Sequence, residues 1–372
     1  MKFSRLDKLM DTLPGLDFPA AELAITKNGE LIYRKSVGYS DGAKTVPVKN
    51  TDLYWIFSAS KVITCIATMR LVERGLIDLN DPVSKYLPEF ENMQILNKDK
   101  TLTPATEPMR IVHLFTMTGG LDYEIKAKEI VECPDRTTRG LVRAMASRPL
   151  SFEPGTRYKY SLCHDLLGAI VEVVSGMTYG EYLKKNIFEP LGIVDMGFKP
   201  TEEQNTRFSA MYKFRNGIMK SIEKEIENPY RLGSEEYESA GAGLFASVDE
   251  YIKIITVIAC GGTTKDGYVL LRPETIEMMK QNRMCDKAID DFGKFGYSWG
   301  LCCRTHIRPD ASFALSPVGE MGWDGAAGAY VMIDTENKLA MYFGTHIYGC
   351  SYVYAMIHPR LRDYLYEDLA DQ

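Results

Sequence analysis

Two stretches of the chain place a serine three residues before a lysine, a spacing that can pair a nucleophile with a base. They are Ser58-Ala59-Ser60-Lys61 and Ser221-Ile222-Glu223-Lys224. On a helix, residues three apart share a face, so the lysine amine can reach the serine hydroxyl. A serine hydroxyl is inert near neutral pH until a base takes its proton, and a helix N-terminus favours the negative charge that then develops.

The surroundings favour the first of these two motifs. Ser58 follows an apolar stretch and precedes an apolar run at 62–74 that has helical spacing. Ser221 lies in the charged stretch 215–231, with no apolar run behind it, so its match is interpreted as accidental. The plainer interpretation of Ser58 is a helix N-cap with a solvent-exposed Lys61, although a lysine in the first turn opposes the helix dipole.

Two other serines lie in G-x-S-x-G patterns, Ser40 at 38–42 and Ser298 at 296–300. That pattern exposes a nucleophile only where a strand turns sharply into a helix. The residues after Gly42 do not start a helix, and those after Gly300 are typical of a strand. Both patterns are therefore interpreted as turn or strand segments, and their serines are the alternatives should Ser58 not be the nucleophile.

Hydrophobic spacing predicts the elements that position these residues. Alternating apolar residues on either side of Asn28-Gly29 predict a hairpin over 21–38, and a second hairpin is predicted over 329–344. Helical spacing occurs at both ends of the chain and in the middle, at 4–13, 62–74, 166–174 and 352–369, and Thr178 with Glu181 and Ser247 with Glu250 are helix-start signals.

Strands near both ends with helices between them predict an α+β fold. We expect one antiparallel sheet flanked by helices from both termini, with an inserted, mainly helical lobe. The expected division is 1–61 and 232–372 for the sheet lobe and 62–231 for the helical lobe.

Composition excludes several classes of protein. The chain has 372 residues, 25% of them charged, with a formal charge of −6, which argues against a protein that works by binding nucleic acid. No apolar stretch is long enough to span a membrane and no secretory signal opens the chain, so we expect a cytoplasmic protein without a membrane partner. Eight cysteines without C-x-x-C spacing favour free thiols.

The spacing of the histidines predicts no metal site, and we expect no cofactor. None of the five histidines shows the spacing of a metal site. His164 lies one helical turn beyond Tyr160 and is interpreted as a hydrogen-bonded structural residue, and Cys65, one turn after Lys61, as a core residue. Cys302 and Cys303 are expected on one strand, with side chains on opposite faces.

Four further segments follow one another in a recognisable order. They are GLIDLNDPV at 75–83, RIVHLFTMTGGL at 110–121, FEPG at 152–155 leading into Tyr160-Ser161, and GAGL at 241–244. Together with Ser58-x-x-Lys61, this order resembles the serine β-lactamase and penicillin-binding-protein superfamily, in particular its class C-like branch. The resemblance spans most of the chain, from the first predicted hairpin to the last.

The resemblance implies the β-lactamase/transpeptidase-like fold, with an active-site cleft between the two lobes. Ser58 would be the nucleophile, and Lys61 and Tyr160 the proton-transfer pair. The backbone N–H groups of Ser58 and Ala326 would form the oxyanion hole. Which member of the Lys61–Tyr160 pair acts as the base during acylation is left open.

Two departures from the family pattern bear on the substrate. Class C β-lactamases have Tyr-Ser-Asn where this chain has Tyr160-Ser161-Leu162, and leucine offers no amide hydrogen bond. In place of Lys-Thr-Gly stands Gly322-Trp323-Asp324-Gly325-Ala326. Trp323-x-Gly325 resembles the Trp-Gly-Gly of the family's carboxylesterases (family VIII), so Trp323, Gly325 and Leu162 are the expected substrate-binding residues.

The sequence thus predicts a serine hydrolase that cleaves small carboxylic esters through an acyl-enzyme on Ser58. A β-lactamase or D-aminopeptidase-like amidase is the enzymatic alternative, and a binding or sensor protein of the same fold is the non-enzymatic one. The expected partner is a small-molecule ester or amide. Oligomeric state, physiological substrate and the choice between hydrolysis and acyl transfer stay open.

Overall fold

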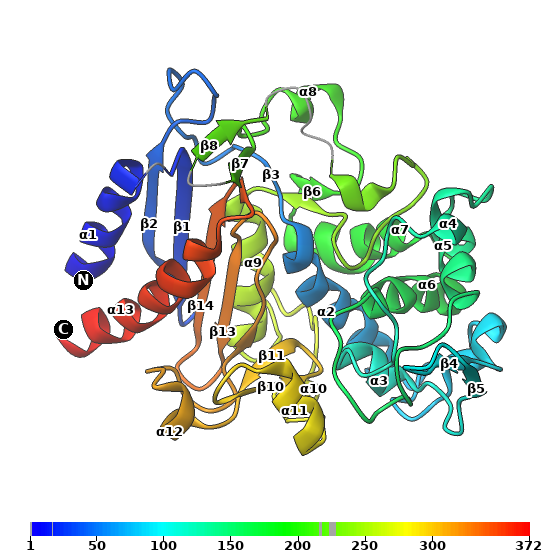
Figure 1. The fold of residues 1–372 in the computed structure, drawn as a ribbon. Helices are drawn as coiled ribbons and strands as arrows, with labels where there is room; N and C mark the ends of the chain where they lie inside the picture. The colour runs from blue at the N-terminus through cyan, green and yellow to red at the C-terminus, as the bar shows by residue number, and fades with distance from the viewer. Residues whose placement is uncertain (1, 17, 216–217, 223–227) are drawn as a thin grey trace.

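The computed structural model describes residues 2–16, 18–215, 218–222 and 228–372. A seven-stranded antiparallel sheet lies on one side of it, on the left in Figure 1, and the mainly helical part lies on the other. The order of the strands in this sheet is β10-β11-β12-β13-β14-β1-β2. Their bounds are β1 Ala20–Lys27, β2 Glu30–Gly38, β10 Tyr297–Gly300, β11 Cys303–His306, β12 Met321–Gly322, β13 Tyr330–Asp334 and β14 Leu339–Thr345.

Both predicted hairpins are confirmed, and they lie side by side. Asn28 and Gly29 connect β1 to β2 with φ values of 53° and 80°, the left-handed conformations that a two-residue hairpin turn requires. Strand β14 of the second hairpin pairs with β1, with Leu23 opposite Phe343. The two ends of the chain therefore close one sheet.

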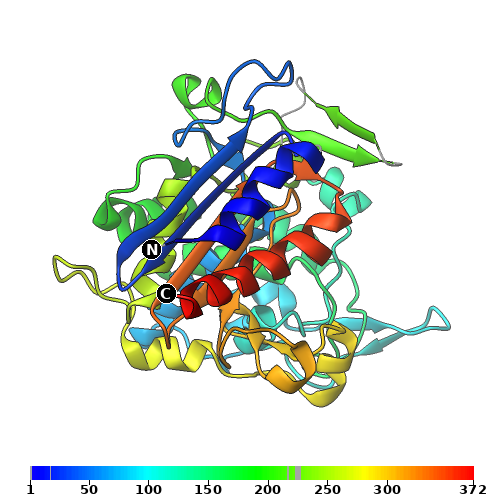
Figure 2. The same cartoon turned by 90° about the vertical axis from the view of Figure 1, so that its left-hand side faces the viewer.

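Helices from the two termini cover one face of this sheet, as Figure 2 shows. Helix α1 (Ser4–Thr12) packs beside α13 (His358–Ala370), and Arg5 pairs with Asp368 at 3.1 Å. The opposite face is covered by α9 (Val248–Ala259), whose Tyr251 stacks on Tyr342 of β14 with ring centres 4.1 Å apart. This arrangement confirms the predicted fold class.

The inserted part is mainly helical, and α2 (Ser60–Glu73) is its central element. Every residue of α2 from Ser60 to Leu71 is buried, as expected of a helix that is apolar around most of its surface. The lobe boundaries at 61/62 and 231/232 stay a prediction. The other helices of this part are α3 Ile111–Phe115, α4 Lys128–Val131, α5 Thr138–Ala146, α6 Cys163–Ser175, α7 Tyr179–Leu183 and α8 Glu202–Asn205.

Three small sheets and three further α-helices lie outside the central sheet and the inserted part, beside short 3-10 and π segments. The sheets are β3 (Tyr54–Trp55) with β9 (Phe245–Ala246) and β6 (Met196–Gly197), β4 (Gln94–Leu96) with β5 (Leu102–Pro104), and β7 (Tyr212–Arg215) with β8 (Ile218–Ser221) and β15 (Ile347–Tyr348). The helices are α10 Pro273–Met279, α11 Asp286–Phe292 and α12 Pro309–Ser312.

Two local expectations need comment. The charged stretch 215–231 contains part of the β7–β8 hairpin, while Asn216-Gly217 and Lys224 lie outside the described residues. The strand expected directly after Gly300 is present as β11 but begins two residues later, at Cys303, because a turn at Leu301 and Cys302 separates β10 from β11. No helix in the described ranges is long and apolar enough to cross a membrane.

Candidate active site

Ser58 lies on a short 3-10 turn, Phe57–Ala59, between β3 and the start of α2. The preceding residue, Phe57, has a φ of 46°, a left-handed conformation that is rare for a bulky side chain and that tends to occur at functional sites. The Ser58 side chain makes no capping hydrogen bond to the helix and is 8% exposed. The N-cap interpretation of Ser58 is therefore wrong.

Lys61 is completely buried, so the interpretation as a solvent-exposed lysine is wrong as well. Its Nζ donates hydrogen bonds to the carbonyl oxygen of Gly241 at 2.7 Å and to Ser58 Oγ at 3.3 Å. The same nitrogen lies 4.8 Å from the ring centre of Tyr160 and 5.4 Å from that of Tyr123. An amine in this position can exchange a proton directly with the Ser58 hydroxyl.

Tyr160 is half-buried and held on both sides by aromatic rings. It stacks on Tyr123 with ring centres 5.3 Å apart and on Trp323 with ring centres 5.7 Å apart. Its hydroxyl accepts a hydrogen bond from Trp323 Nε1 at 3.1 Å. Trp323 therefore orients the phenol and is also part of an aromatic cluster, since its ring lies 4.7 Å from that of Trp299.

Gly325 and Ala326 lie in the turn between β12 and β13, close to the nucleophile turn. A Cβ on Gly325 would lie 2.4 Å from the carbonyl oxygen of Ile56, so only glycine permits this approach. Ser58 lies in the first turn of a helical segment, where N–H groups have no partner within the helix, and the N–H of Ala326 has no backbone partner among the described residues. Both donors are thus available to a ligand.

These groups face a cavity of about 490 Å³. The cavity is largely aromatic, with two charged groups at its edge, and it is of a size for a small organic molecule. The residues that line it are Ser58, Tyr123, Tyr160, Tyr230, Lys294, Trp323, Asp324, Gly325, Ala326 and Tyr354.

Asp324 carries a negative charge at this cavity. Burial alone would raise the pKa of its carboxyl, but Lys294, His358 and Arg304 outweigh burial and hold the pKa well below its usual range. Lys294 Nζ is 3.5 Å from Asp324 Oδ2, and Arg304 Nη1 is 3.4 Å from Oδ1. A carboxylate therefore stands in the segment compared above with the Lys-Thr-Gly of the β-lactamases.

Leu162 does not reach this cavity, which corrects the expectation that it binds substrate. It is 4% exposed at the N-terminus of α6, and its N–H donates to the carbonyl of Asp122 at 3.1 Å. Its side chain lines a separate, small space beside Leu121 and Met145. An apolar side chain at that position packs into the helical core instead of turning to the cleft.

Sequence reasoning missed a buried carboxylate that holds the partner of Lys61 in place. Asp165 is buried on α6, and its Oδ1 accepts hydrogen bonds from Tyr237 Oη and Ser239 Oγ at 2.7 Å each and from the N–H of Gly241 at 3.3 Å. Asp165 thereby fixes the segment around Gly241, whose carbonyl accepts the hydrogen bond from Lys61. The only signal in the sequence is its position five residues after Tyr160, which does not identify these partners.

His164 is buried on α6, and its Nε2 lies 3.4 Å from Cys65 Sγ. Burial and then the charge of Lys61 hold the pKa of His164 well below its ordinary value, so the ring is neutral near pH 7. This contact agrees with the predicted structural, hydrogen-bonded role, and Cys65 is a core residue as predicted.

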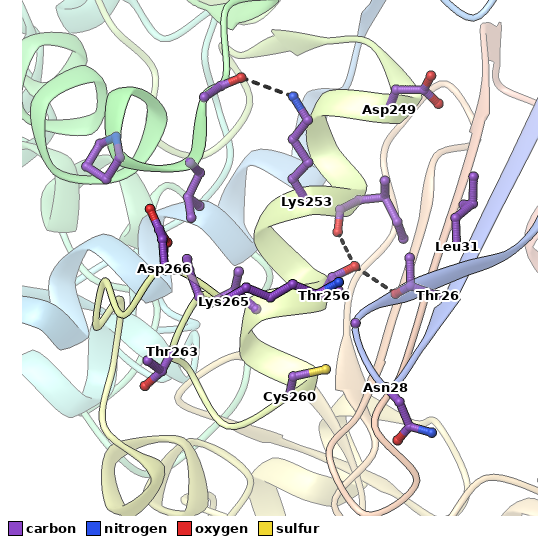
Figure 3. Close-up of a pocket in the computed structure, with 17 residues that line it drawn as sticks. Thr26, Asn28, Leu31, Asp249, Lys253, Thr256, Cys260, Thr263, Lys265 and Asp266 are labelled. Atoms are coloured by element: carbon purple, nitrogen blue, oxygen red, sulfur yellow. Dashed lines mark hydrogen bonds between the residues drawn. The ribbon is translucent and has the colours of Figure 1, made fainter.

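A larger cavity of about 740 Å³ lies between α9, the β1–β2 turn and residues 263–266 (Figure 3). None of its lining residues belongs to the Ser58 site. Its Thr26 and Thr256 hydroxyls hydrogen bond to each other at 2.7 Å, and burial raises the pKa of the Cys260 thiol. No hydrogen bond between a lysine and a serine like that of the Ser58 site is present among the described residues of this cavity, and size alone does not make it the active site.

The fold and the Ser58 site define the class of the serine β-lactamases and transpeptidases. The family described as Beta-lactamase matches residues 6–347, and the chain belongs to this family. The resemblance inferred from the sequence is thereby confirmed.

Relatives within this family bear names of ester chemistry. Esterase EstB of Burkholderia gladioli is 28% identical over 367 residues, covering 91% of this chain and 88% of that protein. Acyltransferase calJ of Penicillium decumbens is 27% identical and covers 87% and 83%. The solved structure of EstCE1, a hydrolase with promiscuous acyltransferase activity, has a TM-score of 0.82 at 23% identity and covers 97% of both chains, which supports the fold.

Proposed function

We propose that this protein is a carboxylesterase that cleaves small-molecule esters through an acyl-enzyme on Ser58. The observation that carries the proposal is the hydrogen bond between the buried Lys61 amine and Ser58 Oγ at the floor of an aromatic cavity. The esterase and acyltransferase names of the relatives agree with this chemistry.

The reaction starts with a proton transfer from Ser58 to the pair formed by Lys61 and Tyr160. The Lys61 amine is hydrogen-bonded to Ser58 Oγ and lies 4.8 Å from the Tyr160 ring, and Oγ then attacks the ester carbonyl. The alcohol leaves with a proton from this pair, and water then attacks the acyl-enzyme to release the acid and regenerate the serine. The backbone N–H groups of Ser58 and Ala326 are the donors for the oxyanion.

The segment 322–326 favours esters over β-lactams. Where a β-lactamase has its lysine this chain has Asp324, which pairs with Lys294 at 3.5 Å, so the segment itself supplies no cation for the carboxylate of a penicillin. Trp323 and the tyrosines offer apolar faces to the acyl or alcohol group of an uncharged ester. We therefore rank ester cleavage above the amidase alternative.

The test is hydrolysis of p-nitrophenyl butyrate by the wild-type protein and by Ser58→Ala. We expect the variant to lose at least about 10³-fold in kcat/KM, because it removes the nucleophile. Ser40→Ala and Ser298→Ala are the matched controls and should keep wild-type rates, since Ser40 lies in a turn and Ser298 is buried in β10. Equal activity of Ser58→Ala and wild type would contradict the assignment.

Intact-mass spectrometry after rapid quenching separates the remaining alternatives. A carboxylesterase shows a transient butyryl group on Ser58 that disappears as substrate is consumed. A stable adduct without turnover would indicate a sensor, and turnover of nitrocefin in preference to the ester would indicate an amidase.

A further inference from the structure

Two thiols and one imidazole lie together one helical turn behind the proposed catalytic residues. They belong to Cys65 on α2, His164 on α6 and Cys303 at the start of β11, and all three residues are completely buried. Cys65 follows Lys61, and His164 follows Tyr160, by four residues in each case. The proposed ester hydrolysis uses none of the three.

The three candidate ligand atoms form a triangle of the size that a metal ion requires. Cys65 Sγ is 3.4 Å from His164 Nε2 and 3.9 Å from Cys303 Sγ, and Cys303 Sγ is 3.9 Å from the same nitrogen. The point equidistant from the corners of this triangle lies about 2.2 Å from each atom, between the metal–nitrogen and metal–sulfur bond lengths of about 2.0 and 2.3 Å.

The backbone at Cys303 supplies an independent observation. Its φ is 65°, and it forms a bulge in which Cys303 and Arg304 both pair with Gly322. A left-handed position in a bulge is usually taken by glycine, because a Cβ crowds the backbone there. A non-glycine residue in such a strained backbone conformation indicates that its side chain has a function.

The ligand set determines the class of metal. Thiolates are soft ligands that favour Cu(I) and Zn²⁺, and structural zinc sites have four ligands. Cys65, His164 and Cys303 make a group of three, and no fourth His, Cys, Asp or Glu among the described residues joins it. Two soft thiolates and one imidazole without a fourth ligand suit a monovalent d¹⁰ cation.

We propose that Cys65, His164 and Cys303 form a trigonal binding site for a soft monovalent cation of the Cu(I) class. Binding breaks the two S–H bonds and forms two metal–sulfur bonds and one metal–nitrogen bond. The two thiol protons leave to solvent, and no oxidation state changes. The cation joins α2, α6 and β11, so it stabilises the packing behind Lys61 and Tyr160 independently of ester turnover.

The test is an anaerobic titration with Cu(I) against the chelator bathocuproine disulfonate. The accessible thiols Cys133, Cys260 and Cys285 are first replaced by serine, and binding is followed over hours because the ligand atoms are buried. We expect one Cu(I) per chain and an affinity at least about 100-fold lower in Cys65→Ala and Cys303→Ala. Cys350→Ala, which removes a buried thiol elsewhere, is the matched control and should bind as the background protein does.

X-ray absorption of the copper-loaded background protein tests the site without a core variant. Two sulfurs and one nitrogen at about 2.2 Å would support the proposal. Two-coordinate or all-sulfur copper, failure to retain Cu(I) against the chelator, or unchanged affinity in the Cys65 and Cys303 variants would overturn it. Ester hydrolysis is not the readout, so failure here leaves the carboxylesterase proposal untouched.

Discussion

The Lys61 amine lies between the carbonyl of Gly241, at 2.7 Å, and the hydroxyl of Ser58, at 3.3 Å. The N–H of Gly241 in turn donates a hydrogen bond to Asp165 Oδ1, which also accepts one from Ser239 Oγ. A continuous series of hydrogen bonds therefore runs from the cavity to the buried carboxylate. This series holds the Lys61 amine in place from the side opposite Ser58.

Lys61→Met should abolish most activity while the protein stays folded. Methionine keeps the length of the side chain but provides no amine, so we expect kcat/KM to fall by about 10² to 10⁴-fold. The free energy of unfolding should be unchanged or higher, since a buried amine is removed. Steady-state ester hydrolysis and urea unfolding measure the two effects. Lys159→Met, at an exposed lysine, is the control, and wild-type activity in Lys61→Met would contradict the role of the amine.

Gly241→Ala should slow the reaction because the added methyl group enters the space between base and carboxylate. Its Cβ would lie 2.6 Å from Asp165 Oδ2 and 3.4 Å from Lys61 Nζ. We expect kcat to fall at least about tenfold and the free energy of unfolding to fall by about 1–3 kcal/mol. Gly15→Ala is the matched control, since a Cβ there meets no atom within 4 Å. Equal kinetics of the two variants would refute the proposed positioning.

Trp323→Phe tests whether the indole N–H orients Tyr160. The variant keeps an aromatic ring but loses the 3.1 Å hydrogen bond to the phenol, so we expect kcat to fall about three- to tenfold. Trp299→Phe is the comparison, because Trp299 Nε1 is buried without a hydrogen-bond partner among the described residues. Thermal unfolding of both variants shows how much stability each loses with the smaller ring, so that a loss of kcat caused by lost packing can be recognised. If Trp299→Phe reduces kcat as much as Trp323→Phe, the hydrogen bond has no specific role.

His346 should make the protein less stable as the pH falls. Burial lowers the pKa of His346 to about 4 in the folded state, against about 6.5 when unfolded. The unfolded chain then binds the extra proton first, so stability is full above pH 6.5 and is lost between about pH 6.5 and 4, by up to about 3 kcal/mol. Urea unfolding at pH 7.5 and 5 measures this loss. His346→Gln should show a shallower dependence, and an unchanged slope would rule out this residue as the cause.

Local patterns made the hairpins, the terminal helices and α2 predictable. The alternation of apolar residues around Asn28-Gly29 and the helical run after Lys61 depend on near neighbours in the chain, and those neighbours also fix the backbone there. The strand predicted after Gly300 begins two residues late, at Cys303, because apolar composition does not distinguish a buried turn from a strand. The prediction that Leu162 binds substrate is wrong for a related reason, since a position in a motif does not fix the direction of its side chain.

The sequence by itself determined the family, the fold class and the pairing of Ser58 with Lys61, because ordered motifs and a three-residue spacing are properties of the linear chain. Only the tertiary structure decided which groups surround that pair. Lys61 and Gly241 are 180 residues apart, and Cys65 and Cys303 are 238 residues apart. Their contacts form when the sheet and the helices bury a shared core, and no local pattern encodes such a meeting.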